Sequence, residues 1–474
     1  PTEWGVFKDI YCAGNEQTFE FLDDVLDYVC EIFPSKYIHI GGDEAPKYRW
    51  EHCPKCQQRM KEEGLPNEEA LQGWFNTRIE NYLAAKGKQI IGWDEILEGG
   101  LSPNATVQSW RGFEGAQHAA EQGHDAIVSP TSHAYFDYPV SSIDVPKVYD
   151  FNLYPPNLDR FTYGHHIIGG ECNLWSERIP NTETLDRRFL PRGIAMSEVL
   201  WSNPAERDYD AFWERLQGHY SLLDVLGYGY DVEQIPVKLG TKNDSFKEEL
   251  KVIVTTEPAF ANLELAVEAP TGMTMGSATT FTERGVHQIK VQPNRGGHAM
   301  GKVLNYEFAV HEGLMTHSCL TSPPTEPYTG TKDIPLVDGV LGSENYRDGN
   351  WVGYFNPDYF SGHFGWDQPY AIDSIKINFL QSRLSWILIP EKVITDVYES
   401  EDQISRYEWD RTSSTSEEGI FIETMVLAPE GGFPATQNID LMIPNTEVLP
   451  DNHPSAGERV WHFLDEVQIY GRPL

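Results

Sequence analysis

The stretch Tyr37-Ile38-His39-Ile40-Gly41-Gly42-Asp43-Glu44 ends a short apolar run with two glycines and two acids. The apolar run is typical of a buried β-strand. The glycines allow a sharp turn and the close approach of a ligand. Two adjacent carboxylates at the exit of a buried strand cannot both be ordinary solvated ions, so one is predicted to keep its proton or to face a charge. The alternative is a solvated pair of loop acids.

Charge and length limit the function of this chain. Its 474 residues allow several domains with large cores. Acids outnumber bases 72 to 36, and the net charge of −36 disfavours nucleic acid and anionic membranes as partners. No run approaches the ~20 consecutive apolar residues of a membrane span. The 13 tryptophans fit either large cores or surfaces that stack on sugars.

Strand and helix patterns alternate through residues 1–230. Strands separated by helices predict a parallel α/β fold, in which the chemistry lies at the carboxyl ends of the strands. The predicted helices cover residues 15–33, 67–86, 113–122, 184–200 and 207–226. The predicted strands are Tyr37–Gly42, Gln89–Trp93, Thr106–Trp110, Ala126–Ser129 and Ile167–Leu174.

Four of the five predicted strand exits carry an aromatic residue beside an acid or a base. Core packing alone would favour aliphatic residues at these places, and filling the core is the alternative for each tryptophan taken singly. Aromatic walls that converge with carboxylates on one face are typical of a carbohydrate pocket. The exits are Asp43-Glu44, Trp93-Asp94-Glu95, Trp110-Arg111, Tyr135-Phe136-Asp137 and Trp175-Ser176-Glu177.

These motifs, in this order, resemble those of glycoside hydrolase family 20, the β-N-acetylhexosaminidases. The resemblance covers about residues 10 to 225 and rests on His39–Glu44, Gly92–Glu95, Ser109–Gly112, Tyr135-x-Asp137 and Leu174–Glu177. It implies a (β/α)8 TIM-type barrel in which the strand before Asp43 is the fourth. The chain would then lack barrel strands one to three. We expect a fragment of a longer gene, or a separate N-terminal segment or chain that completes the barrel, and no normal activity from the chain alone.

The resemblance also implies a division of labour between the two acids. Glu44 would be the general acid, and Asp43 would orient the 2-acetamido group of the substrate. The carbonyl oxygen of that group attacks C1 and forms an oxazolinium ion, so no protein nucleophile and no cofactor is needed. A carboxyl group that serves as a general acid keeps its proton through a raised pKa, and we expect this of Glu44.

The remaining site residues follow from the same resemblance. Tyr135 would hydrogen-bond the acetamido oxygen, Asp137 would assist on that side, and Glu177 would hold the distal hydroxyls of a terminal sugar. His39 would steady the acids, with a satisfied core histidine as its alternative. Three tryptophans would wall the sugar and its acetamido group: Trp93, Trp110 and Trp175.

The function implied is exo-acting removal of terminal β-linked N-acetylglucosamine or N-acetylgalactosamine from an oligosaccharide or glycoconjugate, in an extracellular or periplasmic location. One alternative is a retaining glycosidase with Glu171 or Glu177 as its nucleophile. A second is disaccharide release of the lacto-N-biosidase kind. A third is a carbohydrate-binding or inactive barrel remnant.

The six cysteines include one closely spaced pair, Cys53-Pro54-Lys55-Cys56. A second CxxC that would complete a zinc site does not occur. A structural thiol pair or a local disulfide is therefore favoured over a metal or redox role.

After residue 230 the sequence predicts β structure with turns. Residues 231–313 are predicted to form a linker and a small β-sandwich that begins with Leu250–Thr255. Residues 314–474 resemble a discoidin-like jelly roll, a possible carbohydrate-binding module. Some such modules bind calcium, and Asp338 and Glu466 are the candidate ligands. The alternative is a domain that only supports the barrel.

Overall fold

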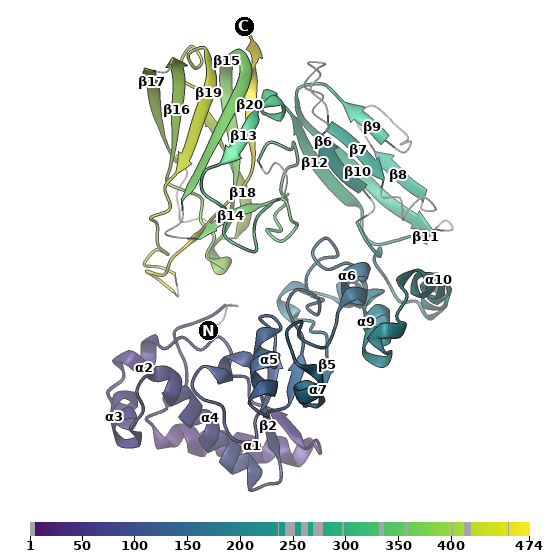
Figure 1. Ribbon diagram of the computed structural model, residues 1–474, viewed down its shortest axis with the longest axis vertical. Coiled ribbons are helices and arrows are strands. Elements are labelled where there is room, and N and C mark those ends of the chain that lie inside the picture. Colours follow the sequence, from purple (N-terminus) through teal and green to yellow (C-terminus); the bar gives the residue numbers. More distant parts are fainter. Residues whose placement is uncertain are drawn as a thin grey trace. The chain divides into compact units, whose positions relative to one another are not determined.

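The computed structural model divides the chain into two compact units (Figure 1). The first holds Pro1–Tyr138 and Val145–Tyr228, and the second holds Pro139–Asp144 and Gly229–Leu474. The prediction of an α/β region followed by β structure is confirmed. The division into 1–230, 231–313 and 314–474 stays a prediction. The described residues are 5–235, 237–241, 252–256, 264–268, 278–295, 298–330, 336–355, 359–400, 402–411, 419–453 and 455–474.

A sheet of five parallel strands is the centre of the first unit. Its strands lie in sequence order, β1 to β5, because each crossover returns the chain to the next position in the sheet. This arrangement puts the carboxyl ends of all five strands at one edge, where the predicted site residues follow. The strands are β1 (Tyr37–His39), β2 (Gln89–Trp93), β3 (Thr106–Ser109), β4 (Ala126–Val128) and β5 (Ile167–Gly170).

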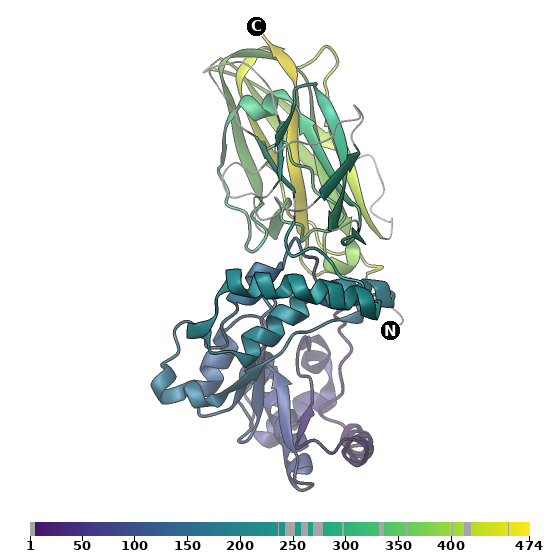
Figure 2. The same cartoon turned by 90° about the vertical axis from the view of Figure 1, so that its right-hand side faces the viewer.

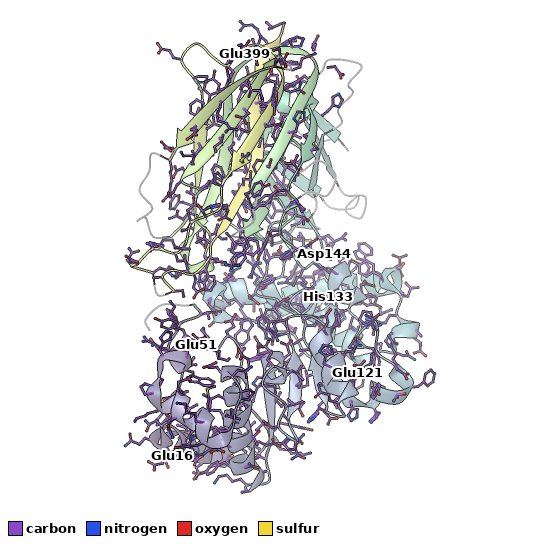
Figure 3. The ribbon with its side chains drawn as sticks, turned by 60° about the vertical axis from the view of Figure 1, so that its left-hand side comes forward. Glu16, Glu51, Glu121, His133, Asp144 and Glu399 are labelled. Atoms are coloured by element: carbon purple, nitrogen blue, oxygen red, sulfur yellow. The ribbon has the colours of Figure 1, made fainter. Side chains whose placement is uncertain are left out.

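Helices connect these strands and carry much of the acidic surface. Glu16, Glu51 and Glu121 lie exposed on α1, α2 and α5 (Figure 3). Within the described residues, no helix combines the length and apolar character needed to cross a bilayer. The helices are α1 (Glu16–Ile32), α2 (Tyr48–His52), α3 (Pro54–Glu63), α4 (Glu68–Ala84), α5 (Glu114–Glu121), α6 (Val145–Asp150), α7 (Arg160–Tyr163), α8 (Thr182–Phe189), α9 (Arg192–Trp201) and α10 (Tyr209–Leu226).

Several predicted boundaries differ from the observed ones for local reasons. The helix predicted over residues 184–200 is two helices, α8 and α9, because Pro191 has no N–H to continue the helical hydrogen bonds. Asn15 occupies the N-cap of α1, but its side chain makes no capping hydrogen bond. Asn67 does cap α4, since its side-chain oxygen accepts from the Ala70 N–H at 2.9 Å.

The strand predicted over Tyr37–Gly42 is shorter in the structure and ends at His39. Gly41 and Gly42 adopt φ angles of 76° and 99°, outside the extended region, and so they turn the chain out of the sheet. The predicted strand Gln89–Trp93 has these same bounds in β2. The other three predicted strands also end earlier than expected.

Two small antiparallel sheets open the second unit. One holds β6 (Val237–Thr241), β7 (Val252–Thr256) and β9 (Ala278–Phe281); the other holds β8 (Glu264–Glu268), β10 (Gly285–Arg295), β11 (His298–Ala299) and β12 (Leu304–Val310). The Phe281 ring of β9 packs against the Phe308 ring of β12 at 4.8 Å, which joins the two sheets. The first two residues of the predicted strand Leu250–Thr255 lie outside the described residues.

An eight-stranded antiparallel sheet completes the second unit. Its long strands β15 and β20, the latter ending at the label C in Figure 2, pair along most of their length. Their alternating apolar residues meet in one core that includes Ile375, Ile377 and Phe379. The discoidin-like assignment stays a prediction. The strands are β13 (His317–Leu320), β14 (Val352–Phe355), β15 (Phe360–Ser382), β16 (Lys392–Ser400), β17 (Gln403–Asp410), β18 (Ile420–Leu427), β19 (Thr436–Ile443) and β20 (Trp461–Pro473).

The two residues predicted to bind calcium lie next to each other in this unit. Glu466 is buried, and its carboxylate accepts from the backbone N–H groups of Gly339 at 2.8 Å and Asp338 at 3.3 Å. His311 Nε2 lies 2.8 Å from the same carboxylate. Calcium takes oxygen ligands, whereas these partners are nitrogen donors, so the arrangement at Glu466 does not favour the ion. Calcium at Asp338 and Glu466 stays a prediction.

Candidate active site

The turn that follows β1 holds Asp43 and Glu44 in an unusual backbone conformation. Two glycines with positive φ precede the acids, and Glu44 itself has φ of 47°, which a non-glycine residue seldom adopts. A Cβ on Gly42 would stand 2.7 Å from Ile96 Cγ2, so this position requires glycine both for its φ and for space. Strained backbone of this kind gathers at functional sites, where the surrounding structure holds it in place.

Neighbouring elements hold this turn. The Trp93 N–H of β2 donates to the Gly41 carbonyl at 2.9 Å. From α4, the Gln72 amide donates to the Gly42 carbonyl at 2.7 Å and accepts from Lys47 Nζ at 2.5 Å. Because contacts on both sides fix the backbone, the two carboxyl groups are presented in a defined place rather than on a free loop.

The electrostatic surroundings of Glu44 favour its protonated form. Neighbouring protein atoms displace water from the carboxyl group, and the negative charges of Asp43 and Glu177 add to the effect, so that the pKa of Glu44 is raised. The side chain still reaches solvent. A carboxyl group that keeps its proton to higher pH and remains accessible can donate that proton to a bound molecule.

Four aromatic rings form a wall beside the acids. Trp93 lies centrally, with its ring centroid 6.5 Å from that of Trp110 and 5.9 Å from that of Trp175. Tyr135 stacks on Trp110 at 6.2 Å. Trp93 and Tyr135 are buried, but Trp175 is 42% exposed. An exposed indole beside buried rings offers a surface for the apolar face of a sugar.

Tyr135 and Asp137 come from an extension beyond β4. Tyr135 forms a parallel bridge with Asn173, and the Phe136 N–H donates to the Asn173 carbonyl at 2.8 Å. Burial raises the pKa of Tyr135, although a hydrogen bond from Trp175 opposes that effect, so its hydroxyl stays protonated. Asp137 is 5% exposed and lies close enough to Tyr135 for its charge to act on the phenol.

Trp110 is held in place by the two acids that end β2. The Asp94 carboxylate accepts from the Trp110 backbone N–H at 3.0 Å and from Arg111 Nε at 2.5 Å. Glu95 accepts from the indole N–H of Trp110 at 2.9 Å. Asp94 is 2% exposed. A buried carboxylate with charged and neutral donors fixes the tryptophan that follows β3.

His39 ends β1 with part of its side chain exposed, and its role stays a prediction. Its ring lies 4.9 Å from that of Trp93, and its Nδ1 accepts from the Gly41 N–H at 3.1 Å. Loss of surrounding water lowers the pKa of His39, against the opposing charge of Glu171 and a hydrogen bond with Gln108. His39 is therefore a neutral ring that braces the turn before Asp43.

The structure brings all the predicted site residues of the first unit to the carboxyl edge of the sheet. Sequence reasoning missed the amide residues Gln72 and Gln108, which lie far from the acids in sequence. Gln72 holds the turn, and Gln108 bonds both Ser129 and Glu171. The signal that could have found Gln108 is its place in a predicted buried strand, where a polar side chain needs partners.

Comparison with known proteins gives matches over this part of the chain. Residues 1–204 match the family described as glycosyl hydrolase family 20, catalytic domain. We call residues 1–204, which contain all five strands of the parallel sheet, the family 20 region. The family 20 region is shared with a beta-hexosaminidase of Porphyromonas gingivalis, 40% identical over 53% of this chain and 34% of that protein. A beta-hexosaminidase of Vibrio furnissii is 33% identical over 38% of this chain and 32% of that protein.

Among solved structures, a beta-N-acetylhexosaminidase from Bacteroides fragilis matches with 29% identity and a TM-score of 0.43. The match covers 48% of each chain. The chain spans about a third of the length of the two curated relatives named above.

Proposed function

We propose that the family 20 region removes terminal β-linked N-acetylglucosamine or N-acetylgalactosamine from oligosaccharides or glycoconjugates. The observation that carries this proposal is the pair Asp43 and Glu44 on a strained turn beside the wall of Trp93, Trp110 and Trp175. The names of the curated relatives, both beta-hexosaminidases, support the same substrate class.

Glu44 acts first, as the general acid. Its raised pKa keeps the proton available, and its exposure lets the leaving glycosidic oxygen approach. General acid catalysis of this kind contributes about 10²–10⁴-fold to the rate. After the leaving group departs, the ionised Glu44 accepts a proton from the water that completes hydrolysis.

Asp43 acts on the substrate's acetamido group. The carbonyl oxygen of that group forms a bond to C1 as the bond from C1 to the leaving oxygen breaks, and the product is an oxazolinium ion. A carboxylate beside this ion stabilises its positive charge. Tyr135, whose hydroxyl stays protonated, donates a hydrogen bond to the acetamido oxygen. Water then opens the ring with retention at C1.

The other residues define the sugar pocket. The tryptophan rings pack on the sugar and its acetamido methyl group, and Asp137 supports the acetamido side. Glu177, which lies near enough to Glu44 to raise its pKa, holds the distal hydroxyls of a terminal sugar. Recognition of the distal hydroxyls makes the reaction exo-acting.

A second candidate function is sugar binding without turnover. Among the described residues, β1 pairs with β2 alone and β5 with β4 alone. The neighbouring α1 exposes Phe21 and Tyr28 at 53% and 66%. Unpaired strand edges beside exposed apolar residues favour a further segment or chain that pairs there. Such a segment would complete the site, and the chain alone would bind the sugar without hydrolysing it.

The test is hydrolysis by the 474-residue chain of matched β-glycosides with and without the 2-acetamido group. We expect turnover of the N-acetyl substrate at a rate below that of a complete barrel, and almost none of the plain glucoside. Equal turnover of both, or a covalent glycosyl adduct on Glu171 or Glu177, would contradict substrate assistance. Binding of N-acetylglucosamine with no hydrolysis of either substrate would favour the second candidate function.

A further inference from the structure

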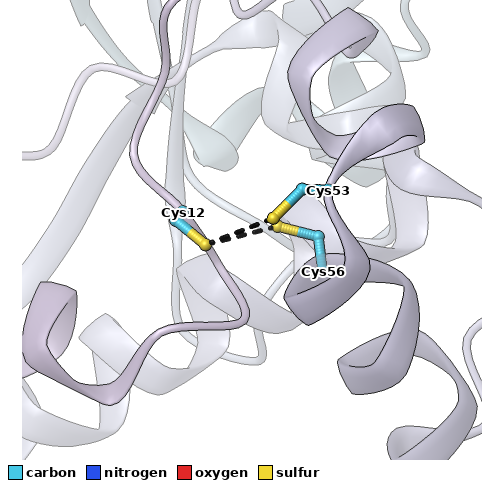
Figure 4. A group of neighbouring side chains, drawn as sticks. All are labelled: Cys12, Cys53 and Cys56. Atoms are coloured by element: carbon cyan, nitrogen blue, oxygen red, sulfur yellow. Dashed lines mark hydrogen bonds between the residues drawn. The ribbon is translucent and has the colours of Figure 1, made fainter.

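Three cysteine side chains from two distant segments meet in the first unit (Figure 4). Cys12 lies in the loop before α1, whereas Cys53 and Cys56 lie at the start of α3. The Cys12 Sγ lies 3.7 Å from the Sγ of Cys53 and 3.7 Å from that of Cys56, and all three sulfur atoms lie within 4.8 Å of one another. All three are free thiols. None of the three cysteines is among the site residues described at the strand ends.

These sulfur positions fit the coordination of a metal ion. Zinc binds thiolates at about 2.3 Å in tetrahedral geometry, which separates neighbouring sulfur atoms by about 3.8 Å. A disulfide instead needs about 2.05 Å between two sulfur atoms and would leave the third without a role. Within the described part of the chain, no other group of three or more His, Cys, Asp or Glu side chains has this spacing.

We propose that Cys12, Cys53 and Cys56 form a binding site for one zinc-class divalent ion. The thiol groups lose their protons as the metal–sulfur bonds form, so that affinity rises with pH. The CxxC motif by itself supplies only two ligands, Cys53 and Cys56, which are too few for a zinc site. The third ligand, Cys12, lies 41 residues before Cys53, and the fold supplies it.

The backbone around the thiols is built for close approach. A Cβ on Gly14 would stand 2.2 Å from the carbonyl carbon and oxygen of Lys55, so only glycine lets the Cys12 loop lie against the start of α3. Cys53 is the N-cap of α3, with Pro54 at the first helical position.

The surroundings favour a structural metal over a reactive thiol. Cys56 is fully buried, so a reactant in solvent cannot reach its thiol, and this disfavours a nucleophilic role. Trp50 and Met60 pack in the apolar cluster around it, and the indole N–H of Trp50 donates to the Tyr11 carbonyl at 2.8 Å. Cys12 and Cys53 are half-buried, so water can take the fourth position.

The test measures metal content and thiolate ligation, with no reference to glycosidase activity. The full chain, purified with a non-thiol reductant, is loaded with Zn²⁺, desalted and measured by mass spectrometry of the metal. We expect one equivalent per chain, and a thiolate-to-metal charge-transfer band when Co²⁺ replaces zinc. Cys56→Ser should lose the retained metal, whereas the matched control Cys30→Ser should keep it.

Two results would overturn the proposal. The first is that the reduced wild-type chain retains less than about a tenth of an equivalent of zinc after loading and desalting. A structural site binds zinc tightly enough to keep it through desalting. The other is a disulfide among the three cysteines in the reduced and metal-loaded protein, found by peptide mapping. If Cys56→Ser fails to fold, titration of the wild-type chain with Co²⁺ decides: saturation without a thiolate band overturns the site.

Discussion

Two of the three Asp-Glu dipeptides in the chain stand in settings that the structure makes very different. Asp43 and Glu44 stand on a turn at the edge of a parallel sheet, where Glu44 reaches solvent. Asp465 and Glu466 lie inside strand β20, 2% and 0% exposed. The same two residue types can therefore exchange a proton with a bound molecule in one place and cannot in the other. The difference lies in the groups that surround them.

The buried pair is satisfied by donors. Asp465 accepts from the Gly342 N–H at 2.8 Å and from the Asn378 amide at 3.1 Å, and Glu466 is bonded by backbone N–H groups and faces His311. Burial raises the pKa of Asp465 to about 7 and lowers that of His311 to about 3. Glu44 instead lies near the like charges of Asp43 and Glu177. A carboxyl group that lacks fixed donors and remains accessible can exchange its proton with a substrate.

The largest expected effect comes from Glu44→Gln. Loss of the general acid should lower kcat/KM by about 10²–10⁴-fold for a substrate with a poor leaving group, such as chitobiose. The free energy of unfolding should change by less than about 0.5 kcal/mol because the side chain is exposed. Steady-state kinetics and urea unfolding check the two parts; a variant with wild-type kcat/KM would remove Glu44 from the acid role.

The buried pair should give the opposite result. Glu466→Ala leaves the N–H groups of Gly339 and Asp338 and the His311 ring without their acceptor, and should lower the free energy of unfolding by about 1–3 kcal/mol for each donor left unsatisfied. Urea unfolding measures it, with Glu44→Gln as the matched control. A loss no larger than that of the control would contradict the structural role of this pair.

An intermediate effect is expected at Asp94. Asp94→Asn weakens the contacts that fix Trp110 and Arg111, and should lower kcat/KM by about tenfold, since misplaced positioning groups cost rate without removing a reacting group. Glu98→Gln is the matched control, because Glu98 accepts from the outer Nη1 of Arg111 at 2.8 Å and leaves the Asp94 contacts in place. Equal losses in both variants would show that Asp94 does not act through Trp110.

The smallest effect concerns pH. Glu177 raises the pKa of Glu44, so Glu177→Gln makes Glu44 easier to ionise. The protonated form of Glu44 then disappears at a lower pH. The alkaline limb of the kcat/KM profile should therefore shift to lower pH by less than about one unit. An unmoved or raised limb would contradict the electrostatic coupling between the two carboxyl groups.

Much of the fold followed from local patterns. Strand β2 has the bounds predicted from its apolar run, because a buried strand shows its burial in sequence. The strand predicted at β1 is too long because Ile40 continues the apolar pattern while Gly41 and Gly42 already leave the sheet. The break between α8 and α9 does have a sequence signal in Pro191, which the helical periodicity on both sides of it obscures.

The candidate site was found through motifs, whereas the residues that support it depend on contacts between distant segments. Gln72 reaches Gly42 across 30 residues, and Cys12 reaches Cys53 across 41. Neither pairing can be recognised from the neighbouring sequence. The first depends on how α4 packs, and the second on how the loop before α1 packs. Sequence patterns therefore indicate the candidate site residues more readily than the residues that hold them in place.

Binding of a thiazoline mimic of the oxazolinium ion tests the central claim most directly, because it probes the role of Asp43 without turnover. Calorimetry on the chain should find the thiazoline bound at least about 10²-fold more tightly than N-acetylglucosamine, as a transition-state analogue is. Asp43→Asn should remove that advantage, whereas Glu466→Gln, in the buried pair, should keep it. Equal affinity for both ligands in the wild-type chain, or an unchanged advantage in Asp43→Asn, would contradict substrate-assisted catalysis at this site.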